Sequence, residues 1–321
     1  MSNLQGGFSG ALSPDAVRTG IDAVLYEEFS RERQPGDVSA QNEAYFRTGP
    51  TVGVSFIHDE NRGVGNFETI GEQEEFLNSS TEIGNQVTKN SQKFYKQVPV
   101  SDEAMRADMV GKREAIGRDI GKRAADTQTQ RAMLDSYGDA FAGAVHTTPD
   151  GQALASNSHT TLAGTTVDNL ETGSLIPDNL WTLVQSLANQ VAQDGDPGSH
   201  RFELFLSNFL NYKSAKEILA SGLIANSAEN NINVFDTDYG QVNIGASIFL
   251  NAAVNTATNA ATSYHIMSRD HQILRKVFYG LETDMKTPRE TSNDTHAFVA
   301  KYHEVVFPGT WTAYAGSNGS V

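Results

Sequence analysis

Histidine, serine and aspartate are the residue types in this chain that could do chemistry, so their spacing is considered first. His296 and His303 lie seven residues apart, with Glu304 directly after the second histidine. Two histidines and a carboxylate can hold a zinc ion when their side chains converge. In a strand, however, residues seven apart point to opposite faces, so this spacing argues against a metal site.

Four aspartates form two closely spaced pairs, Asp194 with Asp196 and Asp236 with Asp238. A calcium-binding loop needs acidic ligands at alternate positions and a glutamate further along. Neither pair has that full spacing. Acidic residues in turns are the better interpretation of both pairs.

Two further motifs are incomplete. Ser158 precedes His159, but no G-x-S-x-G turn that would expose a nucleophilic serine is present. Gly63-Val64-Gly65 opens like a dinucleotide-binding loop but lacks the third glycine and the strand-to-helix context. The sequence therefore predicts no catalytic residues, no cofactor-binding residues and no metal ligands, and the chain is not expected to be an enzyme.

Composition limits the class of protein. The chain has 321 residues, 38% of them apolar, 28 glycines, no cysteine and a net charge of −15. Tight DNA binding depends on lysines and arginines that neutralise phosphates, and no strong basic run is present. The start of the chain lacks the features of a signal peptide, and no apolar stretch approaches the length of a membrane span. We therefore expect a protein that is not exported by the usual route and has no membrane partner.

The first fifty residues predict one helix and an arm. Ser13, Pro14 and Asp15 form a helix start, and the helix is expected to end by Arg33. The stretch from there to Pro50 shows little core potential. We interpret it as an arm that packs on another part or another subunit, with a partly disordered N-terminus as the alternative.

The next fifty residues predict a long two-stranded loop. Thr51–Ile57 and Gln92–Val100 alternate like strands, and the span between them, including Phe67–Val87, is polar and acidic. A loop of this length is improbable inside a compact domain. It becomes reasonable if it projects onto a neighbouring subunit.

A long charged helix is expected from Asp102 to about Tyr137. Its apolar positions form only a narrow stripe, and most of its other positions are charged. Gly111, Gly117 and Gly121 weaken the helix and mark a bend or the close approach of another backbone. Such a helix lies across a sheet edge or along a subunit boundary, and an ordinary solvated surface helix is the alternative.

The rest of the chain predicts mixed helices and strands without a regular βαβ period, which favours an α+β class. The expected helices begin at Pro177 and span Asn211–Leu219. The expected strands are Phe202–Leu206, Val234–Ile244 as strand, turn and strand, Ser247–Leu250, Tyr264–Met267, Ile273–Tyr279 as a strand or short helix, Ala297–Phe307 and Trp311–Tyr314.

This order of segments resembles the major capsid proteins of tailed double-stranded DNA bacteriophages, the HK97-fold family. The resemblance covers most of the chain and is carried by architecture more than by invariant motifs. The passage 147–160, TTPDGQALASNSHT, resembles a D-G-x-x-L turn followed by a histidine in many phage head subunits. Ile176–Trp181 is similar to the start of the A-domain, and Thr295–Val306 to the strand that returns to the P-domain.

The resemblance implies an HK97-like capsid fold with an N-terminal arm, an extended E-loop, a long spine helix, a P-domain and an A-domain. The implied divisions are 1–50 for the arm, 51–101 for the E-loop, 102–140 for the spine helix of the P-domain, 141–172 for the P-domain, 173–289 for the A-domain, 290–308 for the P-domain return strand and 309–321 for the C-terminal strand and tail.

The resemblance also implies a structural role. Hexamers and pentamers of the chain would form an icosahedral shell around packaged double-stranded DNA, without sequence-specific binding. Assembly in the host cytoplasm would yield a virion, with a separate scaffolding protein, a portal and, as an optional partner, a decoration protein. Lys89, Lys93 and Lys96 stand in no recognisable cross-linking context, so the expected stabilisation is noncovalent.

Three alternatives remain at this stage. One is an encapsulin-type nanocompartment shell protein with the same fold. Another is an acidic soluble enzyme, although the eight histidines are scattered along the chain. The third is a tail or adhesion protein, which would be richer in repeats and strands than this sequence.

Overall fold

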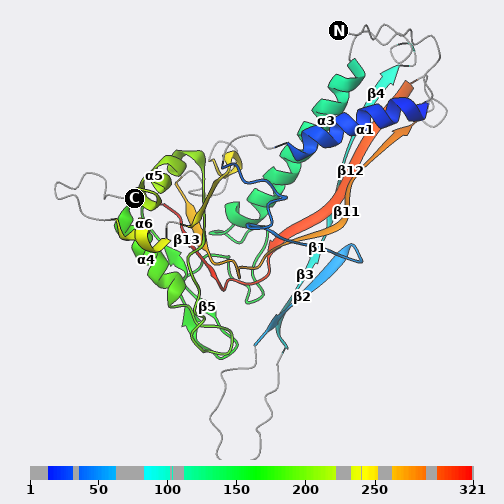
Figure 1. Cartoon of the computed structure of the whole chain (residues 1–321). Coiled ribbons are helices and arrows are strands. Elements are labelled where there is room, and N and C mark those ends of the chain that lie inside the picture. The colour runs from blue at the N-terminus through cyan, green and yellow to red at the C-terminus, as the bar shows by residue number, and fades with distance from the viewer. Residues whose placement is uncertain are drawn as a thin grey trace, which may run out of the picture.

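The computed structural model describes residues 14–31, 36–62, 83–101, 103, 112–221, 233–239, 241–251, 262–286 and 295–319. A rounded body carries a long, narrow sheet and a β-hairpin, which extend from it in opposite directions (Figure 1). The Gly63–Gly65 motif, most of Phe67–Val87 and the first turns of the expected long helix lie outside the described residues.

The two long helices pack against each other. α1 (Pro14–Ser30) has proline at its first position, as predicted, and it lies against α3 (Lys112–Met133). A Cβ atom on Gly121 of α3 would lie 2.3 Å from the carbonyl oxygen of Leu25 in α1. The prediction that a glycine marks the close approach of another backbone is therefore confirmed at Gly121.

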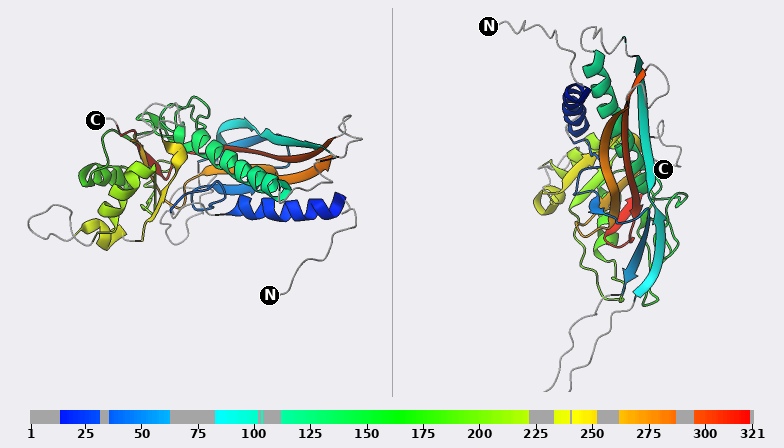
Figure 2. Two further views of the ribbon diagram at one scale, coloured as in Figure 1. Left: turned by 90° about the horizontal axis from the view of Figure 1, so that it is seen from above. Right: turned by 90° about the vertical axis from the view of Figure 1, so that its right-hand side faces the viewer.

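The thin apolar stripe of α3 packs on the long sheet. Ile116 and Ile120 join Leu25 against Phe298 and Ala300 of the strand β12 (Thr295–Pro308). Both helices lie on one side of the sheet (Figure 2). The helix thus crosses the face of the sheet rather than its edge, and it ends in a π-helical turn, η1 (Leu134–Gly138).

The long sheet has the strand order β1-β11-β12-β4. β1 (Arg47–Pro50) runs parallel to β11 (Ile273–Lys286), and β12 pairs antiparallel with both β11 and β4 (Gln92–Ser101). The expected segment Ile273–Tyr279 is a strand and continues to Lys286. Strands Gln92–Val100 and Ala297–Phe307 are confirmed within one residue or two at each end.

Residues 36–46 form part of the main core, which contradicts the expectation of little core potential before Pro50. Tyr45 and Phe46 are fully buried, and Val38 is nearly so. The Tyr45 hydroxyl donates to the carbonyl oxygens of Phe205 and Asn243 at 3.0 and 2.9 Å. Polar neighbours hide this short apolar set in the sequence, because its burial depends on a loop rather than on a periodic element.

A second sheet has the order β7-β13-β10-β8-β9 and both of its faces are covered. Helices α4 (Pro177–Ala188) and α5 (Phe209–Leu219) pack on one face, and Tyr137 and Tyr45 lie on the other. The strands are β7 (Leu170–Glu171), β13 (Tyr314–Ser317), β10 (Tyr264–Met267), β8 (Leu204–Ser207) and β9 (Asn243–Ala246). A separate short pair joins β5 (His159–Thr160) to β6 (Thr166–Val167).

Three expected strands are wrong. The first of the two strands expected within Val234–Ile244 is a helix, α6 (Val234–Tyr239), because the Asn233 side chain accepts from the Phe235 amide at 3.1 Å and caps it. The second is present as β9. Ser247 similarly caps a 3₁₀ turn, η2 (Ile248–Leu250). Residues 311–313 form a turn, with Ala313 at a φ of 61°, and β13 starts only at Tyr314.

A buried ion pair joins the long sheet to the body. Arg275 of β11 contacts Oε2 of Glu304 in β12 through Nε at 2.8 Å and Nη2 at 2.7 Å. Gln128 of α3 donates to the same oxygen at 3.0 Å, and Arg275 also donates to the carbonyl of Ala40 at 3.2 Å. Burial raises the pKa of Glu304, and Arg275 partly opposes this shift.

Replacing Glu304 with alanine should cost about 3–5 kcal/mol of unfolding free energy, because a buried guanidinium loses its partner. Urea unfolding of the single chain measures this loss. The matched control is Glu282→Ala, which breaks an exposed pair with Lys301 on the same two strands (3.1 Å) and should cost less than about 1 kcal/mol. Equal losses in the two variants would contradict the role assigned to the buried pair.

Candidate assembly surface

The projecting hairpin consists of β2 (Ser55–Asn61) and β3 (Ile83–Asn90), paired antiparallel with Ile57 opposite Thr88. A two-stranded projection was predicted, but its pairing was wrong. The expected partner of the first strand, Gln92–Val100, pairs instead with β12 in the long sheet. β3 escaped prediction because most of its residues are exposed and it shows no apolar alternation.

The inner face of the hairpin packs on the body through aromatic and aliphatic side chains. Phe56 of β2 lies 5.9 Å from Phe307 of β12 between ring centroids, and Val87 of β3 joins the same cluster. The ammonium group of Lys276 lies over the Phe56 ring at 4.9 Å. This face holds the hairpin against the body of the same chain.

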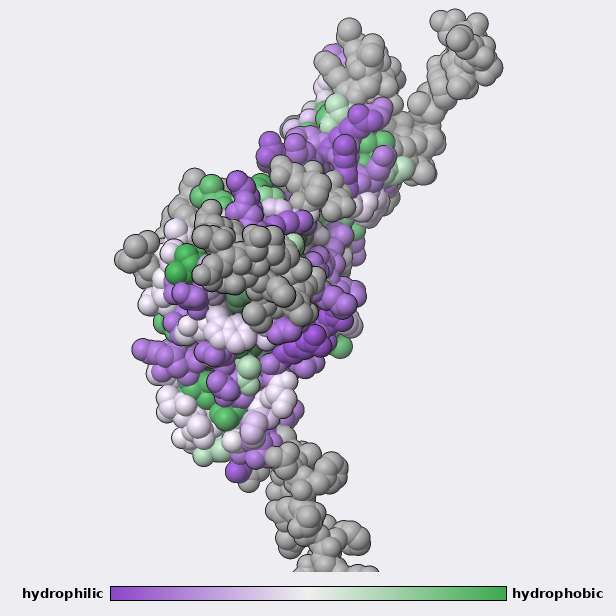
Figure 3. All heavy atoms as spheres, turned by 60° about the vertical axis from the view of Figure 1, so that its left-hand side comes forward, coloured by the Kyte–Doolittle hydropathy of each residue, from purple (hydrophilic) through white to green (hydrophobic). Residues whose placement is uncertain are grey.

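The outer face of the hairpin is open. Ile57 on this face is 59% exposed. Ile83, at the first position of β3 and on the same side of that strand as Val87, is 66% exposed. On the side of the molecule shown in Figure 3, hydrophobic residues form small, separate areas among polar ones. Exposed aliphatic side chains on a projecting hairpin suit contact with another protein surface.

Ser91 joins the hairpin to the long sheet. Its amide and its hydroxyl both donate to the carbonyl oxygen of Val54, at 2.7 and 2.9 Å. The same hydroxyl lies 3.1 Å from Nε2 of His303, whose ring contacts Phe278 and Tyr279 edge-on. His303 thus stabilises the junction between the hairpin and the long sheet.

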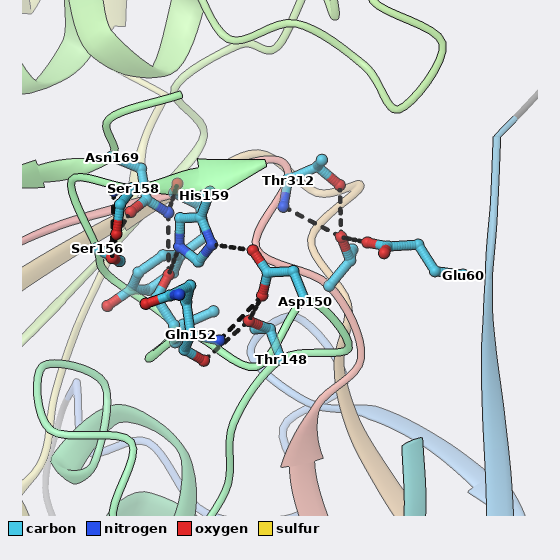
Figure 4. A network of polar contacts seen from close by, with 12 residues as sticks. Glu60, Thr148, Asp150, Gln152, Ser156, Ser158, His159, Asn169 and Thr312 are labelled. Atoms are coloured by element: carbon cyan, nitrogen blue, oxygen red, sulfur yellow. Dashed lines mark hydrogen bonds and ion pairs between the residues drawn. The ribbon is translucent and has the colours of Figure 1, made fainter. Parts of the chain in front are cut away.

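A polar network surrounds the end of the β2–β3 pair that lies away from Ser91, around Glu60, which we call the foot of the hairpin (Figure 4). Glu60 of β2 is 4% exposed, and its Oε1 accepts from Gln193 Nε2 at 2.6 Å and Thr310 Oγ1 at 3.2 Å. Burial raises the pKa of Glu60 to about 7, and the nearby charge of Asp150 adds to this rise while the Thr310 bond opposes it. Sequence analysis missed Glu60, although Phe56, His58 and Glu60 alternate onto the inner face.

Asp150 and His159 form a buried pair beside this foot. Asp150 Oδ2 lies 2.7 Å from Nδ1 of His159, and Nε2 of the same ring lies 3.2 Å from the Leu154 carbonyl. Burial would raise the pKa of Asp150, but the contacts from His159 and Thr148 outweigh burial and lower it. The His159 ring stacks on the fully buried Trp311 at 4.8 Å.

The contacts of Asp150 and His159 fix the histidine ring in place and do not prepare it for nucleophilic chemistry. Both ring nitrogens of His159 are engaged, and the hydroxyl of the adjacent Ser158 contacts Ser156 at 3.2 Å. The D-G-x-x-L turn seen in the sequence therefore positions Asp150 to hold His159 in place. A nucleophilic serine would need a ring nitrogen free to take its proton.

The remaining candidates are dispersed. His296 lies near the start of β12, paired with Val100, whereas His303 lies in the middle of the strand, paired with Lys93. Asp194 accepts from the Asp196 amide within a turn, as expected. Asp236 and Asp238 lie on α6 and not in a turn between strands, because the Asn233 cap starts a helix there. Within the described residues, no three His, Asp or Glu side chains are grouped closely enough to hold a metal ion.

The three lysines near the hairpin differ in their surroundings. Lys93 and Lys96 are exposed on β4, whereas Lys89 of β3 is half-buried. Burial lowers the pKa of Lys89, and Asp139 opposes this shift. Asp139 itself accepts from the amides of residues 144, 145 and 146 at 2.7–2.9 Å, so its hydrogen bonds are made to the loop that follows it.

Sequence comparison finds no matching protein-family model and no significant match among curated proteins. Structure comparison does find similar folds. The virus-like particle protein from Pyrococcus furiosus matches with a TM-score of 0.56 and 10% identity, over 93% of this chain and 98% of that one. The capsid of a native GTA particle matches with a TM-score of 0.56 and 11% identity, over 91% and 94%. The chain has the HK97-type capsid fold.

A phage structure agrees with this assignment. The capsid of Myoviridae phage XM1 matches with a TM-score of 0.51 and 11% identity, over 90% of this chain and 94% of that one. At identities this low the likeness establishes the capsid fold and its α+β class, as predicted. Within the part of the chain that the structure describes, no helix is both long and apolar enough to cross a membrane.

Shortening a side chain on the inner face of the hairpin should weaken the docking of the hairpin on the body. Phe56→Ala removes the ring that packs on Phe307, and we expect about 1.5–3 kcal/mol less stabilisation of the docked hairpin. Hydrogen–deuterium exchange of the β3 amides measures the loss in the unassembled chain. Ile57→Ala on the outer face is the matched control and should leave exchange nearly unchanged. Equal exchange in both variants would show that Phe56 does not hold the hairpin.

Proposed function

We propose that this chain is the major capsid protein of a tailed double-stranded DNA bacteriophage, which self-assembles as hexamers and pentamers into an icosahedral shell. The observation that carries the proposal is the capsid fold over about nine-tenths of both chains, shared with proteins described as particle or capsid subunits. In this proposal the β2–β3 hairpin is the E-loop, α3 is the spine helix, the long sheet belongs to the P-domain and the five-stranded sheet to the A-domain.

The surfaces of the chain are suited to such a shell. The hairpin and the long sheet extend from the body in opposite directions, so each can reach a different neighbour (Figures 1 and 2). The net charge of −15 disfavours tight binding to packaged DNA, which could then move along the inner wall. A scaffolding protein, a portal and a decoration protein are the proposed partners, and the virion is the proposed location.

A shell that encloses cargo other than a genome is the second candidate. The virus-like particle protein of Pyrococcus furiosus and the GTA capsid match this chain with the same TM-score. A catalytic role finds less support, because both nitrogens of the buried His159 are engaged and Ser158 does not contact it.

Electron microscopy of the purified chain, alone and with candidate scaffolding proteins, tests the proposal. We expect closed shells, or rings of six and five subunits. Nucleic-acid content of particles isolated from infected or producing cells separates a genome-bearing capsid from a cargo-bearing compartment. A monomer or dimer under all these conditions would contradict the shell proposal and favour the enzyme alternative.

The outer face of the hairpin should matter for assembly and not for folding. Ile57→Glu places a charge on a side chain that is 59% exposed, so the unfolding free energy should change by less than about 0.5 kcal/mol. The yield of closed shells should fall by tenfold or more, because a charge would be buried between subunits. Ile57→Val is the matched control and should assemble normally. Normal shells from Ile57→Glu would exclude this face from the subunit contacts.

A further inference from the structure

We propose that Glu60 is a proton-operated latch: with a proton on its carboxyl group, the foot of the β2–β3 hairpin stays docked on the body, and ionisation weakens that docking. The latch lies within a single chain. It therefore stands independently of whether the chains form a shell.

The geometry leaves the Glu60 carboxylate only half satisfied. Gln193 and Thr310 both donate to Oε1, and a hydrogen bond from the Asn85 side chain also favours the charged form of the carboxyl group. Oε2 is buried and accepts no hydrogen bond within the described part of the chain. A buried carboxylate is stable in its charged form only when donors or cations satisfy it, so this site favours the protonated form.

The charges around Glu60 do not compensate for the missing hydrogen bond to Oε2. The charged group that acts on Glu60 is Asp150, which has the same sign and raises its pKa further. His159 faces Asp150 rather than Glu60. Thr310, Thr312 and Asn85 contribute neutral groups from the C-terminal turn and from β3. The other ionisable residues of the elements at this foot are His58, Asp59 and Arg62 on and after β2, Lys89 on β3, and Asp194 and Asp196 in the loop of Gln193. Burial lowers the pKa of His58.

The direction of the pH effect follows from the two states of the hairpin. In the docked state burial raises the pKa of Glu60 to about 7, and in a released hairpin the exposed group would return to its ordinary value of 4.5. The docked state therefore binds the proton more tightly. Docking is strongest below pH 4.5 and weakens as the pH rises through 7. Between about pH 6 and pH 8 the docking equilibrium constant should fall about tenfold.

The chain contains its own reporter for this change. Trp311 lies directly after Thr310, the residue that donates to Glu60, and it is fully buried. The other tryptophan, Trp181 on α4, is 38% exposed and lies in the helical layer of the body. The variant Trp181→Phe thus leaves a single tryptophan at the foot of the hairpin.

The experiment is a pH titration of Trp311 fluorescence in the unassembled Trp181→Phe chain, with and without Glu60→Gln. We expect a transition with a midpoint near pH 7 that disappears in Glu60→Gln, because glutamine keeps the acceptor oxygen but cannot ionise. A fluorescence transition that is common to both variants would come from a group other than Glu60. Identical titrations in the two variants would overturn the proposal.

A second variant and a second measurement keep the test decisive if Glu60→Gln does not fold. Thr310→Val removes a donor to the ionised carboxylate, so the midpoint should move upward, and an unchanged midpoint would count against the latch. Hydrogen–deuterium exchange of residues 83–90, corrected for intrinsic rates, should rise about tenfold from about pH 6 to pH 8. Exchange that is independent of pH would refute the docking change itself.

Discussion

The buried ion pair of Arg275 and Glu304 is the interaction on which the arrangement of the chain depends. It joins β11 to β12, takes a third bond from α3 through Gln128 and a fourth to the backbone at Ala40. Two charges withdrawn from water are tolerated only when all of these partners are in place. The long sheet, the long helix and the 36–46 segment are therefore fixed relative to one another at one point, near the junction with the body.

Around this point the chain divides its surfaces between internal and external contacts. One side of the long sheet is covered by α1 and α3, where Gly121 lets the helix backbones touch. The hairpin uses its inner face for Phe307 and its neighbours and leaves Ile57 and Ile83 open. The same hairpin therefore docks on its own chain through one face and leaves exposed aliphatic side chains available for another.

Periodic elements could be predicted from the sequence, whereas most tertiary contacts could not. The helix that starts at Pro177, the long charged helix, the glycine contact at Gly121 and the strand β12 all follow from capping, spacing or alternation. The burial of Tyr45 and the pairing of β3 with β2 depend on surfaces that only the folded chain brings together. Glu60 was missed for the same reason, because its chemistry arises from Gln193 and Thr310, which lie far away in the sequence.

The continuity of β3 and β4 has a mechanical consequence. Residues 83–101 run as one extended stretch, interrupted only at Ser91, from the hairpin to the far end of the long sheet. At about 3.3 Å per residue this stretch spans roughly 60 Å. A pull on the hairpin is therefore carried as tension along covalent backbone, while the ladder of bonds to β12 resists it in shear across ten residue pairs. The chain thus resists extension along the direction in which a neighbour would pull on its projecting hairpin.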